Sequence, residues 1–153
     1  DRKPKVCLEV VSTDVAGPYS PETFDSFRYY VSFIDHYSHF CVIYLMHDKS
    51  EVFDKFVEYQ AMVSNKFQRN IERIRCDRGG EYISKKFVDL NKKNGTVIEY
   101  NVPRNPEQNG VSERLNRTLM NMARCLIMDA KLSKELWGEA ILTSSYVINR
   151  LTT

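Results

Sequence analysis

The chain has 153 residues, about the size at which one domain buries a single hydrophobic core. Hydrophobic residues make up 42% of it, and it shows no long uncharged apolar run, signal peptide or low-complexity tract, which excludes membrane-spanning and disordered classes. The first residue is Asp1 rather than Met. We therefore expect one soluble domain, 1–153, that is a piece of a longer polypeptide and has no membrane partner.

The net charge of +2 is unevenly distributed along the chain. Residues 1–65 have a net charge of −4, from six basic and ten acidic side chains, and residues 125–153 are neutral. Residues 66–124 have thirteen basic and seven acidic side chains, a net charge of +6. Solvated helix faces can explain such charge, but this segment is also where a polyanion would bind.

The four cysteines are isolated from one another and form no Cys-x-x-Cys motif, which favours reduced thiols in a cytosolic or nuclear setting. Without paired cysteines nearby, His36 and His39 do not indicate a zinc site. We interpret both as ordinary turn residues.

The first half of the chain predicts three strands and a helix. Alternating residues predict a strand over Val6–Thr13, with Asp14 at its end, before the breaker Ala16-Gly17-Pro18. Strands over Phe27–Ile34 and Phe40–Leu45 should form a hairpin around Asp35-His36-Tyr37-Ser38. A capping box at Asp48-Lys49-Ser50-Glu51 then predicts a helix to about Phe67.

The second half alternates strands and helices. We predict a strand over Ile71–Cys76 that ends at Asp77, a helix over Ser84–Asn94 that ends at Gly95, and a strand over Thr96–Tyr100. This alternation makes the later strand pairings parallel. A final helix should begin at Ser133 and bury Leu136, Trp137, Ala140, Ile141, Val147 and Ile148.

Between the last strand and the final helix, Val102–Gly110 predicts a flexible loop, because it contains Pro103, Pro106 and an Asn-Gly pair. From Val111 onward, apolar residues recur at 111, 115, 119, 122 and 126, which indicates a helix with one face toward the core. Glu113 falls on the opposite face, together with Arg117, Met120 and Arg124. A carboxylate there can hold a hard cation, and arginines can hold a phosphate backbone.

The resulting element order predicts an α/β fold, a ribonuclease H-like mixed five-stranded sheet flanked by helices. The ends of adjacent strands lie side by side in such a sheet. Asp14 and Asp77 can therefore approach each other, and the helix after the last strand can bring Glu113 to them.

These residues resemble the DDE catalytic triad of retroviral and retrotransposon integrases: Asp14, Asp77 and Glu113, with 35 residues between the last two. The segments that resemble copia-type elements are Thr13-Asp14-Val15-Ala16-Gly17-Pro18, Asp77-Arg78-Gly79-Gly80-Glu81-Tyr82, Leu136-Trp137-Gly138-Glu139-Ala140 and Ile148-Asn149-Arg150. The run from Val102 to Asn116 is similar to the integrase active-site loop and its helix. The resemblance covers nearly the whole chain and implies the catalytic core alone, without the amino-terminal zinc module and the carboxy-terminal DNA-binding tail.

The resemblance implies a two-metal polynucleotidyl transferase that trims element DNA ends and joins their 3′ hydroxyls to target DNA. Two Mg²⁺ or Mn²⁺ ions would be held by Asp14, bridging both, and by Asp77 and Glu113. Implied DNA contacts are Asn105, Gln108, Arg114, Asn116, Arg117 and Arg124. A homo-oligomer is also implied, with the aromatic-rich surface of the first and last helices as a contact. The resemblance further implies nuclear localisation, with passage through cytoplasmic virus-like particles. A host tethering protein is a further expected partner, of unknown identity.

Each of these residues also has a plainer interpretation. Asp14 and Asp77 could initiate turns, and Glu113 could be a first-turn acid that complements the helix dipole. Asp35 is a rival ligand, but it fits an Asx-type hydrogen bond in the hairpin better.

Three further interpretations stay open for individual positions. Glu81 could support the site or face solvent, and Arg117 and Arg124 could form surface ion pairs. Met120 departs from the basic residue that retroviral relatives often have at that position.

Two alternative functions remain for the whole domain. One is a catalytically inactive, domesticated DNA-binding or oligomerisation module of the same fold. The other is a ribonuclease H-type nuclease, which shares the fold and the metals but is disfavoured by the loop and the copia-like carboxy-terminal motifs. Retention of all three acids favours the transferase over a binding module, because clustered carboxylates without metal repel DNA.

Overall fold

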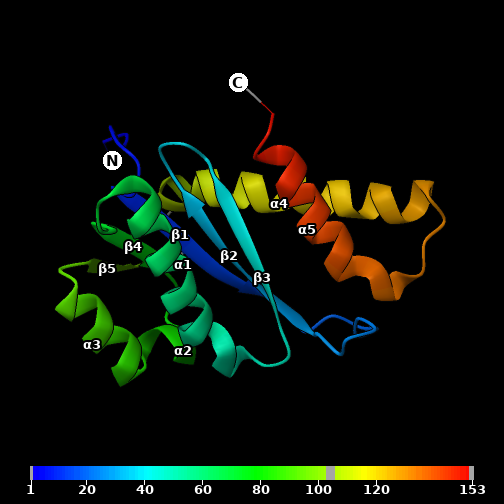
Figure 1. Cartoon of the computed structure of the whole chain (residues 1–153), viewed down its shortest axis with the longest axis horizontal. Helices are drawn as coiled ribbons and strands as arrows, with labels where there is room; N and C mark the ends of the chain where they lie inside the picture. Colours follow the sequence, from blue (N-terminus) through cyan, green and yellow to red (C-terminus); the bar gives the residue numbers. More distant parts are fainter. Residues whose placement is uncertain (1, 103–105, 152–153) are drawn as a thin grey trace.

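The computed structural model describes residues 2–102 and 106–151, with residues 106–109 described by their backbone alone. The strands are β1 (Val10–Ala16), β2 (Tyr29–Asp35), β3 (Cys41–Met46), β4 (Arg73–Cys76) and β5 (Val97–Tyr100). The helices are α1 (Val52–Phe67), α2 (Gly80–Ile83), α3 (Lys85–Lys93), α4 (Pro106–Asp129) and α5 (Trp137–Ile148), and single 3₁₀ turns at Lys49–Glu51 and Lys134–Leu136 precede α1 and α5 (Figure 1).

The five strands form one mixed sheet in the order β3-β2-β1-β4-β5. The pairings of β1 with β2 and of β2 with β3 are antiparallel, while β1 with β4 and β4 with β5 are parallel. The predicted mixed five-stranded sheet, its hairpin and its parallel later pairings are confirmed.

Helices cover both faces of the sheet (Figure 1). On one face, α1 and α3 bury Phe56 and Phe87 against Val31 and Phe33 of β2. The other face carries a second core, in which α4 and α5 pack on strands β2 and β3; its buried members include Tyr30, Ile34, Ile43, Leu119, Ala123 and Ile141. Because successive side chains of a strand point to opposite faces, β1, β2 and β3 each supply residues to both cores, whereas β4 and β5 contribute to the first core.

The predicted first strand is displaced along the chain. The strand begins at Val10 rather than Val6, and it continues through Asp14 to Ala16. Leu8 has a left-handed backbone (φ 65°) and is fully buried, and its N–H donates to Asp35 Oδ1 at 2.9 Å. Alternation alone could not show that this apolar residue belongs to a turn.

The helix that carries Glu113 begins earlier than predicted. Residues 106–110 were expected in the loop, but α4 starts at Pro106, because proline is well tolerated at the first helical position, where its missing N–H has no partner to lose. Residues 103–105 lie outside the described residues.

The apolar stripe predicted for this helix is only partly correct. Leu119 and Ala123 are buried, whereas Leu126 is 38% exposed. Met122 and Leu126 instead line an open hollow of about 560 Å³ between α4 and α5. Met120, predicted on the exposed face, packs against the core under α4 and α5.

Helix caps follow the sequence signals. The capping box of Asp48 and Glu51 is present, with the Asp48 side chain accepting from Ser50 N–H at 2.9 Å. Ser84 caps α3, which ends just before Gly95, a residue with a positive φ of 73°. Local polar side chains thus cap the 3₁₀ turn that leads into α1 and the start of α3.

The final helix follows the 3₁₀ turn after Ser133 and buries Ala140 and Ile141 as predicted. Leu136, Trp137 and Ile148 are half-buried, but Val147 is 38% exposed, so its predicted burial is wrong. All four cysteines are free thiols. None of the helices that the structure describes is long and apolar enough to cross a membrane.

Candidate active site

Asp14 and Asp77 are brought together by the parallel pairing of β1 and β4. Val10 lies opposite Arg73 and Ser12 opposite Arg75, a constant offset of 63 residues. The same offset, extended two residues past the last pair, would bring Asp77 beside Asp14, and the negative charge of Asp77 does act on Asp14. Asp14 was predicted at a strand end and instead lies inside β1, where it pairs with Ser32 of β2.

The Asp14 side chain lies on the face of the sheet that α4 and α5 cover. Val11 and Val15 contribute to the core on the opposite face, so the alternating position of Asp14 projects toward α4, the helix that carries Glu113. Its Oδ1 accepts a hydrogen bond from Val15 N–H at 3.0 Å. Asp14 is therefore directed toward the helix that the sequence analysis expected to complete the site.

The carboxylate of Asp14 has an unusual affinity for protons. Its pKa is raised to about 6, chiefly because the surrounding protein displaces solvent, and then because Asp77, Glu81 and Glu113 add negative charge. Part of the residue stays exposed at the surface. A carboxylate in this environment is stabilised by a cation.

Asp77 follows β4 and also forms the turn that its plainer interpretation predicted. Its Oδ1 accepts from Gly79 N–H at 2.7 Å. A Cβ atom added at Gly79 would come within 2.9 Å of that oxygen and 2.7 Å of Glu81 Oε1. The missing side chain of Gly79 thus lets two carboxylates approach each other, which makes Glu81 part of the site rather than a remote surface acid.

Glu113 is exposed on α4, seven residues after the helix start at Pro106. That is about two turns into the helix, beyond the first turn where an acid complements the dipole, so this alternative is wrong. Among residues 2–102 and 110–151, no three His, Cys, Asp or Glu side chains converge as a ready metal cluster. The negative charge of Glu113 contributes to the raised pKa of Asp14, but among the described residues the carboxylates of Glu113, Asp14 and Asp77 do not converge on one metal position.

A buried tyrosine connects the segments that carry the two aspartates. Tyr82 of α2 is fully buried, and its hydroxyl lies 2.9 Å from the Thr13 hydroxyl of β1. The Tyr100 hydroxyl donates to the Tyr82 carbonyl at 2.8 Å, and the Arg78 guanidinium lies 4.9 Å from the Tyr100 ring centroid. These contacts were not predicted, because α2 is too short for its residue pattern to reveal a helix.

Asp35 has the structural role that the hairpin predicted. It is 2% exposed and accepts from Leu8 N–H, from Ser38 N–H at 2.9 Å and from the Ser38 hydroxyl at 2.6 Å. His36 differs from its prediction as an ordinary turn residue. It is buried against the Ser12 hydroxyl, and burial followed by the charge of Arg75 lowers its pKa to about 4.

The structure describes the side chains of only some of the predicted DNA contacts. Asn105 and the Gln108 side chain lie outside the described residues. Arg114 is exposed and folds back over Gly110, while Asn116 is half-buried, with its side-chain oxygen buried and lacking a hydrogen-bond partner among the described atoms.

Arg117 and Arg124 are both exposed on α4. Neither forms an ion pair with a residue that the structure describes, so the interpretation as surface ion pairs is not supported. Arg124 lies near Tyr19 and Trp137 at the far end of the helix.

Several transposon proteins are similar to this chain along almost its whole length. The retrovirus-related Pol polyprotein from transposon TNT 1-94 of Nicotiana tabacum is 40% identical over 143 residues, 94% of this chain and 11% of the polyprotein. That from transposon RE2 of Arabidopsis thaliana is 35% identical over 147 residues, 95% of this chain and 10% of the polyprotein. The Ty1-DR4 Gag-Pol polyprotein of Saccharomyces cerevisiae is 33% identical over 148 residues, 95% of this chain and 9% of the polyprotein. This chain thus spans about a tenth of these relatives.

Solved structures share the fold at low sequence identity. The HTLV-2 integrase catalytic core domain in complex with magnesium, in its trimeric form, matches 94% of this chain and 86% of its own, with a TM-score of 0.68 and 16% identity. A chain of the simian T-cell lymphotropic virus intasome in complex with PP2A regulatory subunit B56 gamma matches 99% of this chain and 52% of its own, with a TM-score of 0.77 and 17% identity. The ribonuclease H-like fold is therefore confirmed.

The family model described as the integrase core domain matches residues 7–106. This match covers β1 to β5, including the strands that position Asp14 and Asp77. It agrees with the resemblance drawn from the sequence motifs and with the fold of the solved structures. The chain belongs to the integrase core domain family.

Proposed function

We propose that this chain is the catalytic core of a copia-type retrotransposon integrase, a metal-dependent polynucleotidyl transferase for 3′-end processing and strand transfer. The observation that supports it most is the parallel β1–β4 register, whose offset, extended past its last pair, would bring Asp77 beside Asp14 on the face toward the helix of Glu113. The substrates are the element's DNA ends and target DNA. The proposed site of action is the nucleus, after passage through cytoplasmic virus-like particles.

The proposed cofactor is Mg²⁺ or Mn²⁺, two ions per site. Carboxylate oxygens are the ligands that such hard cations prefer. The pKa of Asp14 is raised first by burial and then by neighbouring negative charge, which a cation would neutralise. Asp14, Asp77 and Glu113 would hold the ions, which requires Glu113 to approach the two aspartates. Bound ions activate the attacking hydroxyl and stabilise charge on the phosphate and the leaving oxygen.

The protein's own groups have three tasks in this proposal. The carboxylates hold their positions at adjacent strands, Gly79 keeps the space beside Asp77 open, and the exposed Arg117 contacts phosphates of the DNA backbone. Arg114, which directly follows Glu113, and Asn116, about one turn after Glu113 along α4, are further candidate contacts.

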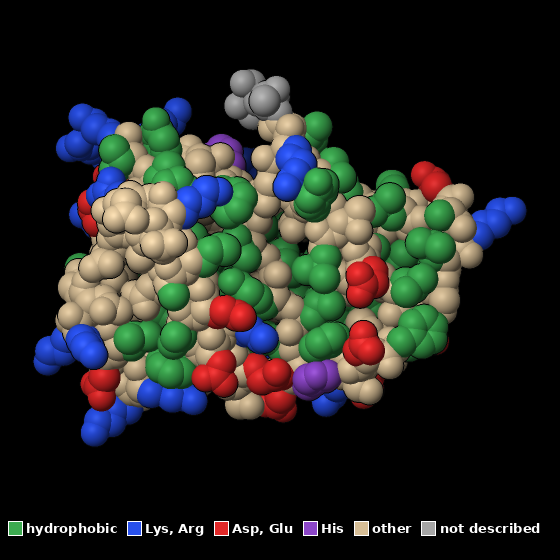
Figure 2. Space-filling view, in the orientation of Figure 1, with side chains coloured by type: hydrophobic (Ala, Val, Ile, Leu, Met, Phe, Trp, Pro, Cys, Tyr) green, Lys and Arg blue, Asp and Glu red, His purple; other side chains and the backbone are tan. Residues whose placement is uncertain are grey.

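Joining two DNA ends needs at least two active sites, so a homo-oligomer is part of the proposal. Figure 2 shows hydrophobic side chains gathered over α5 and its border with α4. Tyr146 and Val147 are 58% and 38% exposed there. The aromatic side chains of α1 face the core instead, so α1 offers the exposed Val57 and Met62 rather than an aromatic surface.

Glu113→Gln tests the catalytic role without changing side-chain size. We expect the variant to keep its fold and lose Mg²⁺- or Mn²⁺-dependent strand transfer on labelled DNA, while Glu139→Gln, an exposed glutamate of α5, keeps it. For the catalytic core tested by itself, a branched DNA substrate that reports the reverse of strand transfer is the suitable assay. Activity of Glu113→Gln equal to the unmodified chain removes Glu113 from the mechanism.

The same assay separates the alternative functions. Binding of DNA with no metal-dependent chemistry in the unmodified chain supports a domesticated binding module. Hydrolysis of the duplex without resolution of the branched substrate supports a nuclease.

A further inference from the structure

A hollow of about 260 Å³ opens at the end of α4 that is distant from Glu113. Three segments far apart in sequence line it: Tyr19 and Pro21 from the β1–β2 loop, Arg124 from α4, and Lys134 and Trp137 at the start of α5. We call it the Tyr19–Trp137 pocket. It is smaller than the usual pocket for a drug-sized ligand and suits a single aromatic group.

The aromatic walls of the Tyr19–Trp137 pocket are held in place by specific contacts. The two ring centroids lie 4.9 Å apart with the planes tilted by 50°. The indole Nε1–H of Trp137 donates to the Pro21 carbonyl at 2.8 Å, and the Tyr19 hydroxyl donates to Met120 Sδ at 3.8 Å. A ligand would therefore meet rings that are already positioned, which reduces the entropy lost on binding.

Two cations at the rim give this pocket a charge preference. Arg124 and Lys134 are both exposed, and neither forms an ion pair with any residue of the described part of the chain. Tyr19 stacks on Tyr30 on one side, with ring centroids 6.0 Å apart, and lines the pocket together with Trp137. Aromatic side chains with unpaired cations beside them match a nucleotide, whose base stacks on rings and whose phosphate binds cations.

The pocket lies on the same face of the sheet as the proposed active site. Tyr19 follows Asp14 by five residues, and burial raises the pKa of Tyr19 while Arg124 lowers it and Asp14 raises it, so both charges act on this ring. Glu113 and Arg124 are eleven residues apart on α4, about 16 Å along the axis. This equals about five nucleotide steps of 3.4 Å, the rise per nucleotide of a strand that keeps its bases stacked as in a duplex.

We propose that the Tyr19–Trp137 pocket binds one unpaired nucleotide of the DNA substrate, about five nucleotides from the reacting phosphate. Its base stacks against Tyr19 and Trp137, and its phosphate binds Arg124 and Lys134. A paired base has its faces covered by neighbours, so the nucleotide has to come from a single-stranded stretch. This inference depends on DNA being the substrate, as in the proposed function.

Trp137 is the only tryptophan of the chain, so its fluorescence reports directly on this pocket. We expect a duplex with a single-stranded tail of about five nucleotides to quench the fluorescence on titration without divalent metal, which separates binding from catalysis. The same duplex with an abasic tail keeps the phosphates and removes the stacking partners. Equal quenching by the two duplexes overturns the proposal.

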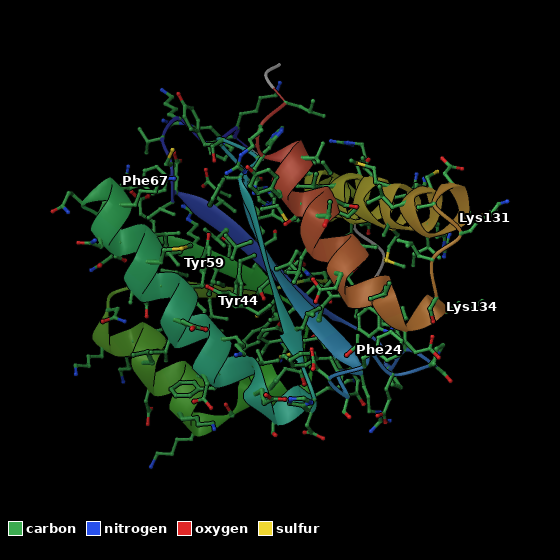
Figure 3. The ribbon with its side chains drawn as sticks, turned by 45° about the vertical axis from the view of Figure 1, so that its right-hand side comes forward. Phe24, Tyr44, Tyr59, Phe67, Lys131 and Lys134 are labelled. Atoms are coloured by element: carbon green, nitrogen blue, oxygen red, sulfur yellow. The ribbon has the colours of Figure 1, made fainter. Side chains whose placement is uncertain are left out.

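Two pairs of variants test the rings and the cations separately. Tyr19→Phe keeps the ring and should keep the affinity, whereas Tyr19→Leu should raise the Kd about fivefold or more. Lys134→Ala should raise the Kd, while Lys131→Ala in the neighbouring turn should not (Figure 3). Equal effects of Lys134→Ala and Lys131→Ala contradict the phosphate contact even if Tyr19→Leu fails to fold.

The same titration distinguishes other occupants and the failure of the proposed function. A Trp137 emission shift that depends on protein concentration alone assigns the pocket to a second copy of the chain and overturns the proposal. Metal-dependent strand transfer with no Trp137 quenching leaves the proposed function intact and removes only the pocket. Quenching by the tailed duplex together with inactivity on every substrate supports the pocket in a binding module.

Discussion

The Thr13 and Tyr82 hydroxyls lie 2.9 Å apart in the buried interior, and this hydrogen bond joins two segments that are 69 residues apart. Thr13 directly precedes Asp14 in β1, and Tyr82 lies in the short helix after Asp77. Asp14 is one residue from Thr13 and Asp77 is five residues from Tyr82, so both aspartates lie close in sequence to this hydrogen bond. The contact therefore joins the segment that follows Asp77 to β1.

Tyr82→Phe should lower the free energy of unfolding by about 1 kcal/mol, because Thr13 loses its buried partner. If Tyr82 positions the aspartates, the Mg²⁺ concentration for half-maximal activity should also rise. Denaturant unfolding and a metal titration measure the two effects. Tyr44→Phe, for which no hydroxyl hydrogen bond is seen within the described part of the structure, is the control. An unchanged metal dependence in Tyr82→Phe restricts Tyr82 to a structural role.

Asp14→Asn should stabilise the metal-free protein at pH 7. The folded pKa of Asp14, about 6, lies above its ordinary value of 3.8, so the folded state binds more protons between these values. Stability from this group is lost as the pH rises through that window, and the asparagine removes the loss. Because Asp14 is partly exposed, solvent screens the effect and the rise in Tm should be small.

Mg²⁺ provides the second half of this test. Added Mg²⁺ should raise the Tm of the unmodified chain and leave Asp14→Asn nearly unchanged, because the variant lacks a charged ligand. Asp89→Asn, an exposed acid of α3, should respond like the unmodified chain. Equal Mg²⁺ stabilisation of Asp14→Asn and the unmodified chain excludes Asp14 as a ligand.

Local signals in the sequence were sufficient for most of the fold. The turn at Asp35 and the capping box at Asp48 are formed by side chains within a few residues of the backbone groups they bind, so their patterns predict them directly. The positions of Asp14 and Asp77 next to strand breakers were also visible, and parallel pairing then fixes their register.

The errors come from contacts between distant segments. The helix around Glu113 continues back through Asn109-Gly110 despite their low helix propensity, and tertiary context commonly overrides such weak preferences. Met120 is partly buried because Tyr19 and the core under α4 lie against it, which no pattern within the helix reveals. Tyr82 and the Tyr19–Trp137 pocket depend on partners 69 and more than 100 residues away.

Asp35→Ala should unfold the domain more easily without changing the chemistry per folded molecule. The variant leaves the buried Leu8 N–H and the Ser38 groups without their charged acceptor, at a cost of about 3 kcal/mol. Denaturant unfolding and activity normalised to the folded fraction measure the two quantities. Loss of normalised activity would instead support Asp35 as the rival ligand.

His36→Gln should flatten the acid side of the stability profile. The folded pKa of His36, about 4, lies below its ordinary value of 6.5, so the unfolded chain binds a proton first as the pH falls. The unmodified protein therefore loses stability between pH 6.5 and pH 4, and the glutamine removes that loss. Denaturant unfolding across this range measures it.

The Asp14 effect runs in the opposite direction over an overlapping range, so the His36 slope is clearest in an Asp14→Asn background. His39→Gln changes an exposed histidine of the same turn and serves as the control. If His36→Gln and His39→Gln give the same slope, burial of His36 beside Ser12 and Arg75 does not control its protonation. A steeper slope in the Asp14→Asn background that His36→Gln abolishes assigns the acid sensitivity of the fold to this single buried ring.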